Sequence, residues 1–442
     1  MLPSSDIFLF ASAFNSKKHP VSLTGMENNS DINFELCVLC KTSRGLCGRK
    51  SCPLLQNWSK QYSIEQPKIE NLDETFSPPS FFVGWTGYPR INAGPMLTAN
   101  RVASDIIDNS RNWLKKSQED IVKMRISLMR TNSKINVKRP LDSDIIQKSQ
   151  ELLLGKKAID VEVQLERKVI PRITLDERMA PHGPIVPIKK MDITENQSPI
   201  NAIEKSFYDT DLLATDAVSY MGKEKIDENT ITRVFSAGMI GRKENRKLVP
   251  TRWSIAAVDD ILSKANVEKV KLLPELGEFR VFSYTFFGNR FVIILIPDVW
   301  SYEMIETWFR GAFMNPSDKD IAVEDWEGYN GRTSYASNIT GAYYAARLGV
   351  TEYLLKIKRQ SQVLVLREIS DDYRFPLGVW VIRLAVREAM KRKYKVFDNI
   401  DSAFELVEKM FDYPLRHWKY RSKLYDLNKR QTKLDTFLMN QS

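Results

Sequence analysis

The spacing of apolar and polar positions divides the chain into helical and extended segments. Apolar residues recur at roughly helical spacing from residue 98 to 132, which predicts helix. Residues 158–167 instead alternate apolar and polar side chains, the period of a strand with one solvated face. By the same criteria we expect further helices over 142–154, 209–221, 255–265, 302–313, 341–359, 378–393 and 401–410.

Strand signals are strongest in the second half of the chain. Residues 279–287 and 290–296 are joined at Gly288-Asn289, which predicts a hairpin, and 363–369 is apolar enough to be a buried strand. Short strands separated by Gly/Pro turns are predicted over 78–95. Since these elements follow no regular strand–helix–strand repeat, the sequence predicts an α+β fold, with mixed helices and short strands around a central sheet.

All four cysteines lie in one short stretch, as a Cys-x2-Cys pair followed by two more residues of the same type: Cys37, Cys40, Cys47 and Cys52. Four thiolates satisfy a tetrahedral zinc ion and leave no open coordination position, so a structural zinc knuckle is predicted. An iron–sulfur cluster with the same ligand number remains an alternative, as do unligated thiols or disulfides.

Charge points to a polyanionic partner. The 442 residues include 65 Lys and Arg against 55 Asp and Glu, a formal net charge of +10. This balance favours DNA or RNA. Lys41, Arg44, Arg49 and Lys50 surround the cysteines and favour DNA contact there. No apolar run reaches the roughly 18 residues that span a bilayer, so no membrane partner is expected.

The first 25 residues carry a short apolar patch without the basic residues of a signal peptide. We interpret Met26 as the native start and expect a cytoplasmic protein. The composition then predicts four parts: a poorly ordered extension (1–33), the knuckle with a connector (34–75), an α+β main domain (76–415), and a basic segment with a tail (416–442).

The tail has the form Gln-x-x-aliphatic-x-x-Phe-apolar. Within one helical turn, Leu434, Phe437 and Leu438 would share a face, and Gln431 could reach a separate polar pocket. Such a flexible terminal plug is typical of proteins that dock on DNA sliding clamps. The alternative is the last turn of an amphipathic helix that packs against the body.

The basic run at 416–430 also allows two interpretations. Its interleaved aromatics, Trp418 and Tyr420, could stack on nucleic acid. The favoured interpretation is a solvated helix face with buried aromatics.

Catalytic signals are weak. The sequence has three histidines and lacks both a P-loop and a Gly-x-Ser-x-Gly motif. A metal-dependent nuclease would need converging carboxylates. Three acidic groups are candidates, but each is better explained as helix caps or surface acids: Asp209, Asp211 and Asp216; Asp259 and Asp260; Glu324, Asp325 and Glu327.

Polar residues in Gly/Pro-rich loops form a second set of candidates, because loops carry function more often than cores do. If they meet in space, they would make a cationic pocket for a phosphate-bearing ligand: Arg90, Asn92, His182, Arg252 and Arg332.

Together the knuckle, the 78–95 stretch and the tail resemble the archaeal Nre family of DNA repair proteins. The resemblance includes His-Gly-Pro at 182–184 and the stretches 247–254 and 363–380. It implies a zinc-binding N-terminus on the four cysteines, binding of a PCNA-type clamp through Gln431, Leu434, Phe437 and Leu438, and a role in repairing DNA damage. The tail has Phe-Leu where two aromatics often stand. The resemblance carries no catalytic residues, so a clamp-recruited adaptor and a clamp-recruited nuclease both remain open.

Overall fold

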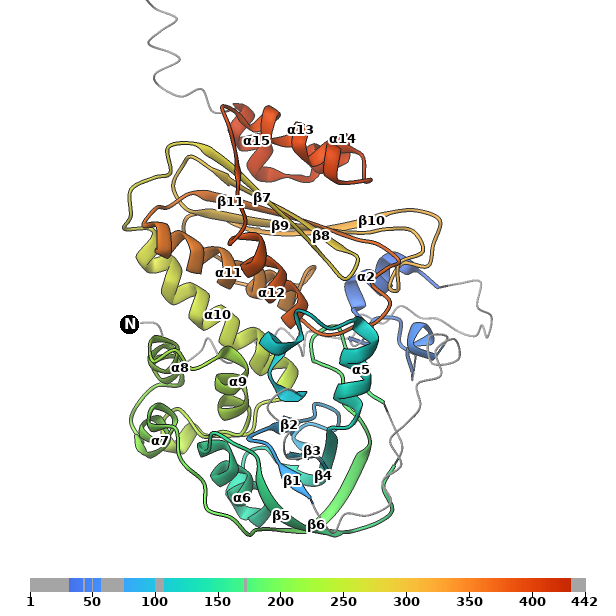
Figure 1. The fold of residues 1–442 in the computed structure, drawn as a ribbon, viewed down its shortest axis with the longest axis vertical. Helices are drawn as coiled ribbons and strands as arrows, with labels where there is room; N and C mark the ends of the chain where they lie inside the picture. The colour runs from blue at the N-terminus through green and yellow to red at the C-terminus, as the bar shows by residue number, and fades with distance from the viewer. Residues whose placement is uncertain are drawn as a thin grey trace, which may run out of the picture. The chain divides into compact units, whose positions relative to one another are not determined.

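The computed structural model describes residues 32–42, 44–49, 51–56, 75–99, 107–170 and 173–430. The chain divides into two compact units: unit 1 comprises residues 1–56, 266–374 and 382–442, and unit 2 comprises 57–265 and 375–381. Each unit contains a six-stranded sheet (Figure 1). The mixed α+β class is therefore confirmed, although the described residues hold two sheets where the sequence predicts one central sheet.

In unit 2 the strand order is β1-β5-β6-β4-β3-β2. The pair β4 and β6 is parallel, and the other neighbouring pairs are antiparallel. The strands are β1 (Phe76–Ser77), β2 (Phe81–Val83), β3 (Arg90–Leu97), β4 (Met129–Asn136), β5 (Ile159–Leu165) and β6 (Ile185–Ile193).

One face of this sheet packs against helices of unit 2 in the largest of that unit's apolar clusters. Along β3 and β4, Ile91, Ala93 and Ile135 are buried, while the residues between them, Arg90, Asn92 and Lys134, are exposed. Period-2 alternation therefore gives these strands one dry and one solvated face. The helices are η2 (Ser110–Trp113), α5 (Gln118–Ile126), η3 (Pro140–Asp142), α6 (Asp144–Leu154), α7 (Asn201–Tyr208), α8 (Ala214–Lys223), α9 (Glu228–Ser236), η4 (Lys243–Asn245) and the first part of α10 (Thr251–Val270).

The sheet of unit 1 has the order β10-β9-β11-β8-β7-β12. Its central strand, β11, pairs in parallel with β9 and antiparallel with β8. The strands are β7 (Phe279–Phe286), β8 (Asn289–Ile296), β9 (Ser301–Trp308), β10 (Ile321–Glu327), β11 (Gln362–Ile369) and β12 (Lys395–Phe397).

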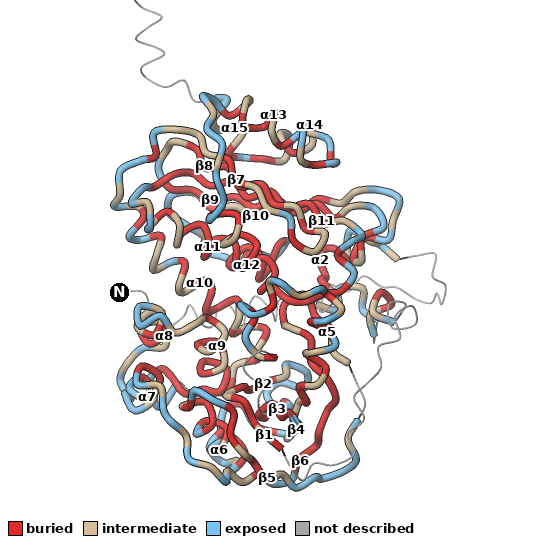
Figure 2. Tube along the Cα trace, viewed as in Figure 1, coloured by how far each residue is buried: buried red, intermediate tan, exposed pale blue. Residues whose placement is uncertain are grey.

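Helices cover both faces of this sheet. In Figure 1, α13, α14 and α15 lie over one face, and α11 and α12 lie over the other. Every residue of β9 and β11 is consequently buried, as the red trace in Figure 2 shows. The helices that complete unit 1 are α2 (Phe34–Cys40), α11 (Gly341–Ile357), α12 (Trp380–Ala389, of which 382–389 belong to this unit), α13 (Ile400–Met410), α14 (Leu415–Arg421) and α15 (Lys423–Arg430).

The predicted helix over 302–313 is wrong, because Ser301–Trp308 form β9. Glu303 and Glu306 made this segment resemble a helix with a solvated face, yet both carboxylates are buried. Glu303 accepts hydrogen bonds from the Ser422 hydroxyl and from the backbone N–H groups of Lys423 and Leu424, at 2.7–3.0 Å. Internal partners thus replace the water that the pattern implies.

Other helix predictions identify a helix that is present but misplace where it begins or ends. Among the described residues of the 98–132 segment, helix is found at 107–108, η2 and α5, and from Met129 the chain is strand β4, which pairs with β3 and β6. The helix expected at 209–221 is α8, which begins at Ala214. The helix expected at 255–265 is α10, which is longer at both ends and runs from Thr251 to Val270. The predictions for 142–154, 158–167, the hairpin, 341–359, 363–369, 378–393 and 401–410 are confirmed to within a few residues.

The basic run becomes α14 and α15. Trp418 is fully buried in the unit 1 core, and Lys419 and Arg421 pair with Asp401 and Glu324. This confirms the helical interpretation for Trp418. Tyr420, in contrast, is 90% exposed.

Candidate functional site

The four cysteines follow one another through a capped helix and a turn. Asn33 caps α2 through its side chain, and the helix ends at Lys41 in the left-handed conformation. Gly45 and Gly48 both have positive φ, which glycine adopts without strain, and they turn the chain between the cysteine pairs. Cys37 and Cys40 are buried, whereas Cys47 and Cys52 are partly exposed, and all four are free of disulfides.

The thiol of Cys37 is influenced by its burial and by the charges of the other three thiols. Burial raises the pKa of Cys37 to about 11, and the charges of Cys52, Cys40 and Cys47 add to the rise. Burial likewise raises the pKa of Cys52. Four soft donors whose mutual repulsion a cation would relieve fit a zinc-type ion. Across the described ranges, however, no three His, Cys, Asp or Glu side chains lie in metal-ligating geometry.

Lys41, the residue that ends α2, anchors this segment to the sheet of unit 1. Its ammonium lies 2.7 Å from Glu306 Oε2 and 4.8 Å from the centre of the Trp308 ring, and it is 1% exposed. Glu306 also pairs with Arg367, which bonds to the Asn289 side-chain oxygen. Burial alone would raise the pKa of Glu306, but the two cations outweigh it and lower that pKa.

Two of the basic residues expected to favour DNA contact at the knuckle are therefore used inside the protein. Lys41 is buried, and Arg44 donates to the Ser337 carbonyl at 2.8 Å. Arg49 is exposed, and Lys50 lies outside the described residues. The contacts show the segment braced against unit 1.

The five residues of the predicted phosphate pocket fall into three places. Arg90 and Asn92 lie on the solvated face of β3, while His182 and Arg252 are buried in unit 2. Arg332 belongs to unit 1, where it pairs with Asp325 at 3.2 Å and donates to the Trp326 and Tyr335 carbonyls. The role of Arg332 in the structure is thus to hold the loop after β10.

His182 and Arg252 contact aromatic rings at one end of β2. The His182 ring lies 5.0 Å from Phe82, and the Arg130 guanidinium lies 4.6 Å from the same phenyl ring. Arg252 lies 4.8 Å from the centre of the Trp85 ring and 3.5 Å from Asp176 Oδ2. Sequence reasoning missed Trp85 as a site residue, although an aromatic side chain in a Gly-rich turn was the available signal.

Gly183, in the His-Gly-Pro loop, has a structural reason for being glycine. Its N–H donates to the Leu128 carbonyl at 3.0 Å, and an added Cβ would lie 1.7 Å from the Ile126 backbone oxygen. That clash is with backbone, which cannot rotate away.

We expect Gly183→Ala to lower the free energy of unfolding by about 1–3 kcal/mol, the cost of forcing extra volume into a packed interior. Denaturant unfolding measures it. Gly277→Ala is the matched control, since no atom lies within 4 Å of its added methyl group and its φ is not positive. Equal stability of the two variants would contradict the packing explanation.

Some of the acidic residues considered for a nuclease are buried, with structural partners, and others are exposed. Asp325 accepts from the Asn338 and Ile339 N–H groups at 3.0 and 2.8 Å, and Glu327 pairs with Arg347. They are buried, so for Asp325 and Glu327 the expectation of surface acids is wrong. It is also wrong for Asp259 and Asp260, which are buried on α10, whereas Asp209, Asp211 and Asp216 are exposed as expected.

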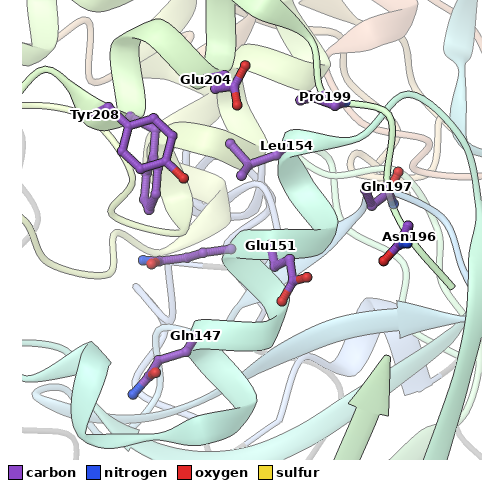
Figure 3. Close-up of a pocket in the computed structure, with 10 residues that line it drawn as sticks. Gln147, Glu151, Leu154, Asn196, Gln197, Pro199, Glu204 and Tyr208 are labelled. Atoms are coloured by element: carbon purple, nitrogen blue, oxygen red, sulfur yellow. The ribbon is translucent and has the colours of Figure 1, made fainter. Parts of the chain in front are cut away.

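A cavity of about 470 Å³ lies between α6, α7 and the segment before α7 (Figure 3). Its polar lining consists of amides, the Tyr208 hydroxyl and the carboxylates of Glu151 and Glu204, and no Lys or Arg lines it. Carboxylates without a compensating cation disfavour a phosphate group. This cavity is not the phosphate site predicted from the sequence.

The fold and its candidate sites define a mixed α+β protein that braces a four-cysteine segment against one of two sheets. Residues 46–315 match the family described as archaeal Nre, N-terminal, and residues 327–437 match archaeal Nre, C-terminal. The chain belongs to the archaeal Nre family.

Two curated relatives from one organism align along nearly their whole length, and a third aligns over a shorter part. The chain is 36% identical over 396 residues to DNA repair protein NreB of Archaeoglobus fulgidus, covering 90% of this chain and 98% of the relative. It is 35% identical to NreA of the same organism, over 91% of this chain and 98% of the relative. NreA of Haloferax volcanii is 35% identical over 71% of this chain and 77% of the relative. No solved structure gives a significant match.

Proposed function

We propose that this protein acts in DNA repair. The observation that carries the proposal is the near full-length similarity to relatives named as DNA repair proteins. The formal net charge of +10 supports contact with a polyanion such as DNA. The described residues contain no helix both long enough and apolar enough to cross a membrane.

A survival assay tests this role directly. Archaeal cells lacking the gene should become more sensitive to DNA-damaging agents, and the intact chain should restore survival. Unchanged survival across agents that alkylate, crosslink and break DNA would contradict the proposal.

Within that role we propose a structural zinc ion on Cys37, Cys40, Cys47 and Cys52. The support is the electrostatic proximity of the four thiols and the anchoring of the segment through Lys41. The zinc would cross-link a segment that is too short to bury a core of its own. The side chains of the segment, such as Lys41, would anchor it to the rest of the chain.

We further propose that the tail recruits the protein to a PCNA-type sliding clamp. The tail residues Gln431, Leu434, Phe437 and Leu438 lie outside the described residues, so their sequence pattern is the support. Three apolar side chains on one helical turn suit a hydrophobic groove.

Replacing both Phe437 and Leu438 by Ala should abolish clamp binding, because buried anchors carry most of the energy at such interfaces. A pull-down with the purified clamp measures it. Met439→Ala with Gln441→Ala is the matched control, which truncates neighbouring side chains outside the motif. Retention of full binding by the Phe437 and Leu438 variant would refute the docking assignment.

In this role the protein acts as an adaptor that binds DNA. Among the described residues no carboxylates converge in ligating geometry, so no observation favours a nuclease. Incubation of the purified protein with Mg²⁺ or Mn²⁺ and branched, damaged or single-stranded DNA distinguishes the two. Metal-dependent cleavage at catalytic rates would replace the adaptor with an enzyme.

A further inference from the structure

Within unit 2 we propose a site that binds unpaired DNA bases at Trp85 and Tyr88, with the phosphates held by the surrounding basic residues. We call this the stacking surface. It comprises Trp85, Tyr88 and Trp253 together with Arg90, Lys134, Lys138, Arg139 and Lys247. The inference rests on the proposed role in DNA repair and specifies the form of DNA that the protein contacts.

Three segments far apart in sequence meet at this surface. The Val83 N–H donates to the Thr251 hydroxyl at 2.9 Å, so the start of α10 joins the end of β2. The Val137 N–H donates to the Pro89 carbonyl at 3.0 Å, and the Leu248 N–H donates to the Val137 carbonyl at 3.1 Å. All of these residues belong to unit 2, so the surface is complete within one unit.

Two large aromatic side chains are exposed here on ordered backbone. Trp85 and Tyr88 each expose 43% of their surface, in the turn between β2 and β3. The Arg252 guanidinium lies over the Trp85 ring, and the Tyr88 ring lies 6.0 Å from that of Trp253. Each ring is therefore supported from within, which holds it in place at low entropic cost when a base stacks on it.

The charge of the three segments has one sign. Residues 81–97, 129–139 and 247–254 contain seven Lys and Arg and no Asp or Glu. Arg252 is buried beneath Trp85 as a positioning residue, whereas Arg90, Lys134, Lys138 and Arg139 are exposed. Segments whose charged residues are all cationic attract the phosphate backbone of nucleic acid.

Strand register gathers cations and amides on one face of β3 and β4, directly after the turn that carries the rings. Arg90 pairs with Asn136 and Asn92 pairs with Lys134 across β3 and β4, and all four are exposed. Directly paired residues of antiparallel strands lie on the same face of the sheet. The face thus offers two cations for phosphates and two amides that can hydrogen-bond base edges.

The combination of exposed rings and neighbouring cations should favour binding of unpaired bases over duplex DNA. Stacking requires a free π-face, which a base within a duplex shares with its neighbours. Cations alone bind single and double strands alike, so the two exposed rings are what should favour the single strand. DNA with displaced or unpaired bases is the substrate class that this chemistry recognises.

The test is fluorescence anisotropy of full-length protein with a labelled single-stranded oligonucleotide and with the duplex of the same sequence. Trp85→Ala with Tyr88→Ala should weaken single-strand binding roughly tenfold or more, since each stacked base contributes about that factor. Duplex binding should change less than threefold. Trp85→Phe, which keeps a ring, should retain most of the single-strand affinity.

Two controls separate stacking from general effects. Tyr329→Ala removes a tyrosine of unit 1 that is 45% exposed, close to the value for Tyr88, and Lys395→Ala removes an exposed cation there, and neither should affect the single-strand preference. Arg90→Ala with Lys134→Ala should make single-strand binding less sensitive to salt. The slope of log affinity against log salt concentration should fall by about 0.7 for each phosphate that the variant no longer neutralises.

Each outcome has a defined meaning. Wild-type affinity of the Trp85 and Tyr88 double variant for the single strand would overturn the stacking surface, as would equal losses for single strand and duplex. Wild-type protein that binds duplex but not single strand would overturn this inference and leave the DNA repair role intact. If wild-type protein binds neither form, both this inference and the proposed DNA contact fail.

Discussion

Replacing Lys41 by Met is expected to lower the free energy of unfolding of unit 1 by about 3–5 kcal/mol, the usual cost of removing one partner from a buried ion pair. The change leaves Glu306 buried with Arg367 as its remaining charged partner. Lys41 is 1% exposed and its ammonium lies 2.7 Å from the Glu306 carboxylate. Water therefore has no access to Glu306 that could replace the lost ammonium. Denaturant unfolding, followed by circular dichroism, measures the change.

A surface pair of the same chemistry provides the control. Lys391 lies 2.6 Å from Glu388, but its side chain is 65% exposed. Lys391→Ala should therefore change stability by less than about 0.5 kcal/mol, because solvent screens exposed pairs. A loss for Lys41→Met no larger than for Lys391→Ala would show that burial does not strengthen the anchor.

Removing the carboxylate as well should not recover the loss. In the Lys41→Met, Glu306→Gln double variant the buried Arg367 guanidinium loses the charge of Glu306 and keeps the neutral Asn289 side-chain oxygen as an acceptor. Acidification gives an independent check. Because Glu306 has a lowered pKa, its contribution is complete above the ordinary value near 4.5 and is lost as the pH falls through the lower folded-state pKa.

The second large effect concerns the proposed zinc. Protein purified under reducing conditions should hold about one zinc per chain, and Cys40→Ser should lose it, because a structural site needs all four donors. Metal analysis measures the content, and hydrogen exchange across residues 34–56 measures the order of the segment. Exchange should accelerate on chelation, since metal binding is folding energy for such segments.

Ser51→Ala, a change within the same segment at a residue outside the donor set, should retain the metal and its slow exchange. Iron in place of zinc, with visible absorbance, would move the site to the iron–sulfur alternative. A chain that holds no metal in either form would contradict the proposal outright.

Local sequence patterns were sufficient wherever all the interacting residues lie close together in the chain. The hairpin of β7 and β8 is an example, because its two apolar runs are adjacent and its turn, at Phe287-Gly288, lies within one residue of the predicted position. In the cysteine stretch the helix, cap and turns are likewise built from neighbours, but the sequence predicted a knuckle there and not a helix, and its zinc stays a proposal.

The same patterns gave wrong predictions where a charged residue that looks solvated has a buried partner far away in the chain. Glu303 and Glu306 look solvated in sequence, but their partners are the start of α15 and Lys41, the latter 265 positions away. Because these partners could not be read from the local sequence, we predicted a helix where the structure has β9. Lys41 was equally misleading, since a basic residue beside a metal-type motif suggests nucleic acid until its buried partner is known.

For this protein the order of residues was enough to establish the α+β class, the family resemblance, the cysteine quartet and the tail motif, because each is written in residue types at short spacing. Only the folded chain shows which charges are buried and which aromatic rings are exposed. Folding paired Arg332 with Asp325 within unit 1 and set Arg252 beneath Trp85 within unit 2. Burial depends on contacts between segments more than a hundred residues apart, such as Val83 with Thr251, and no local pattern encodes those contacts.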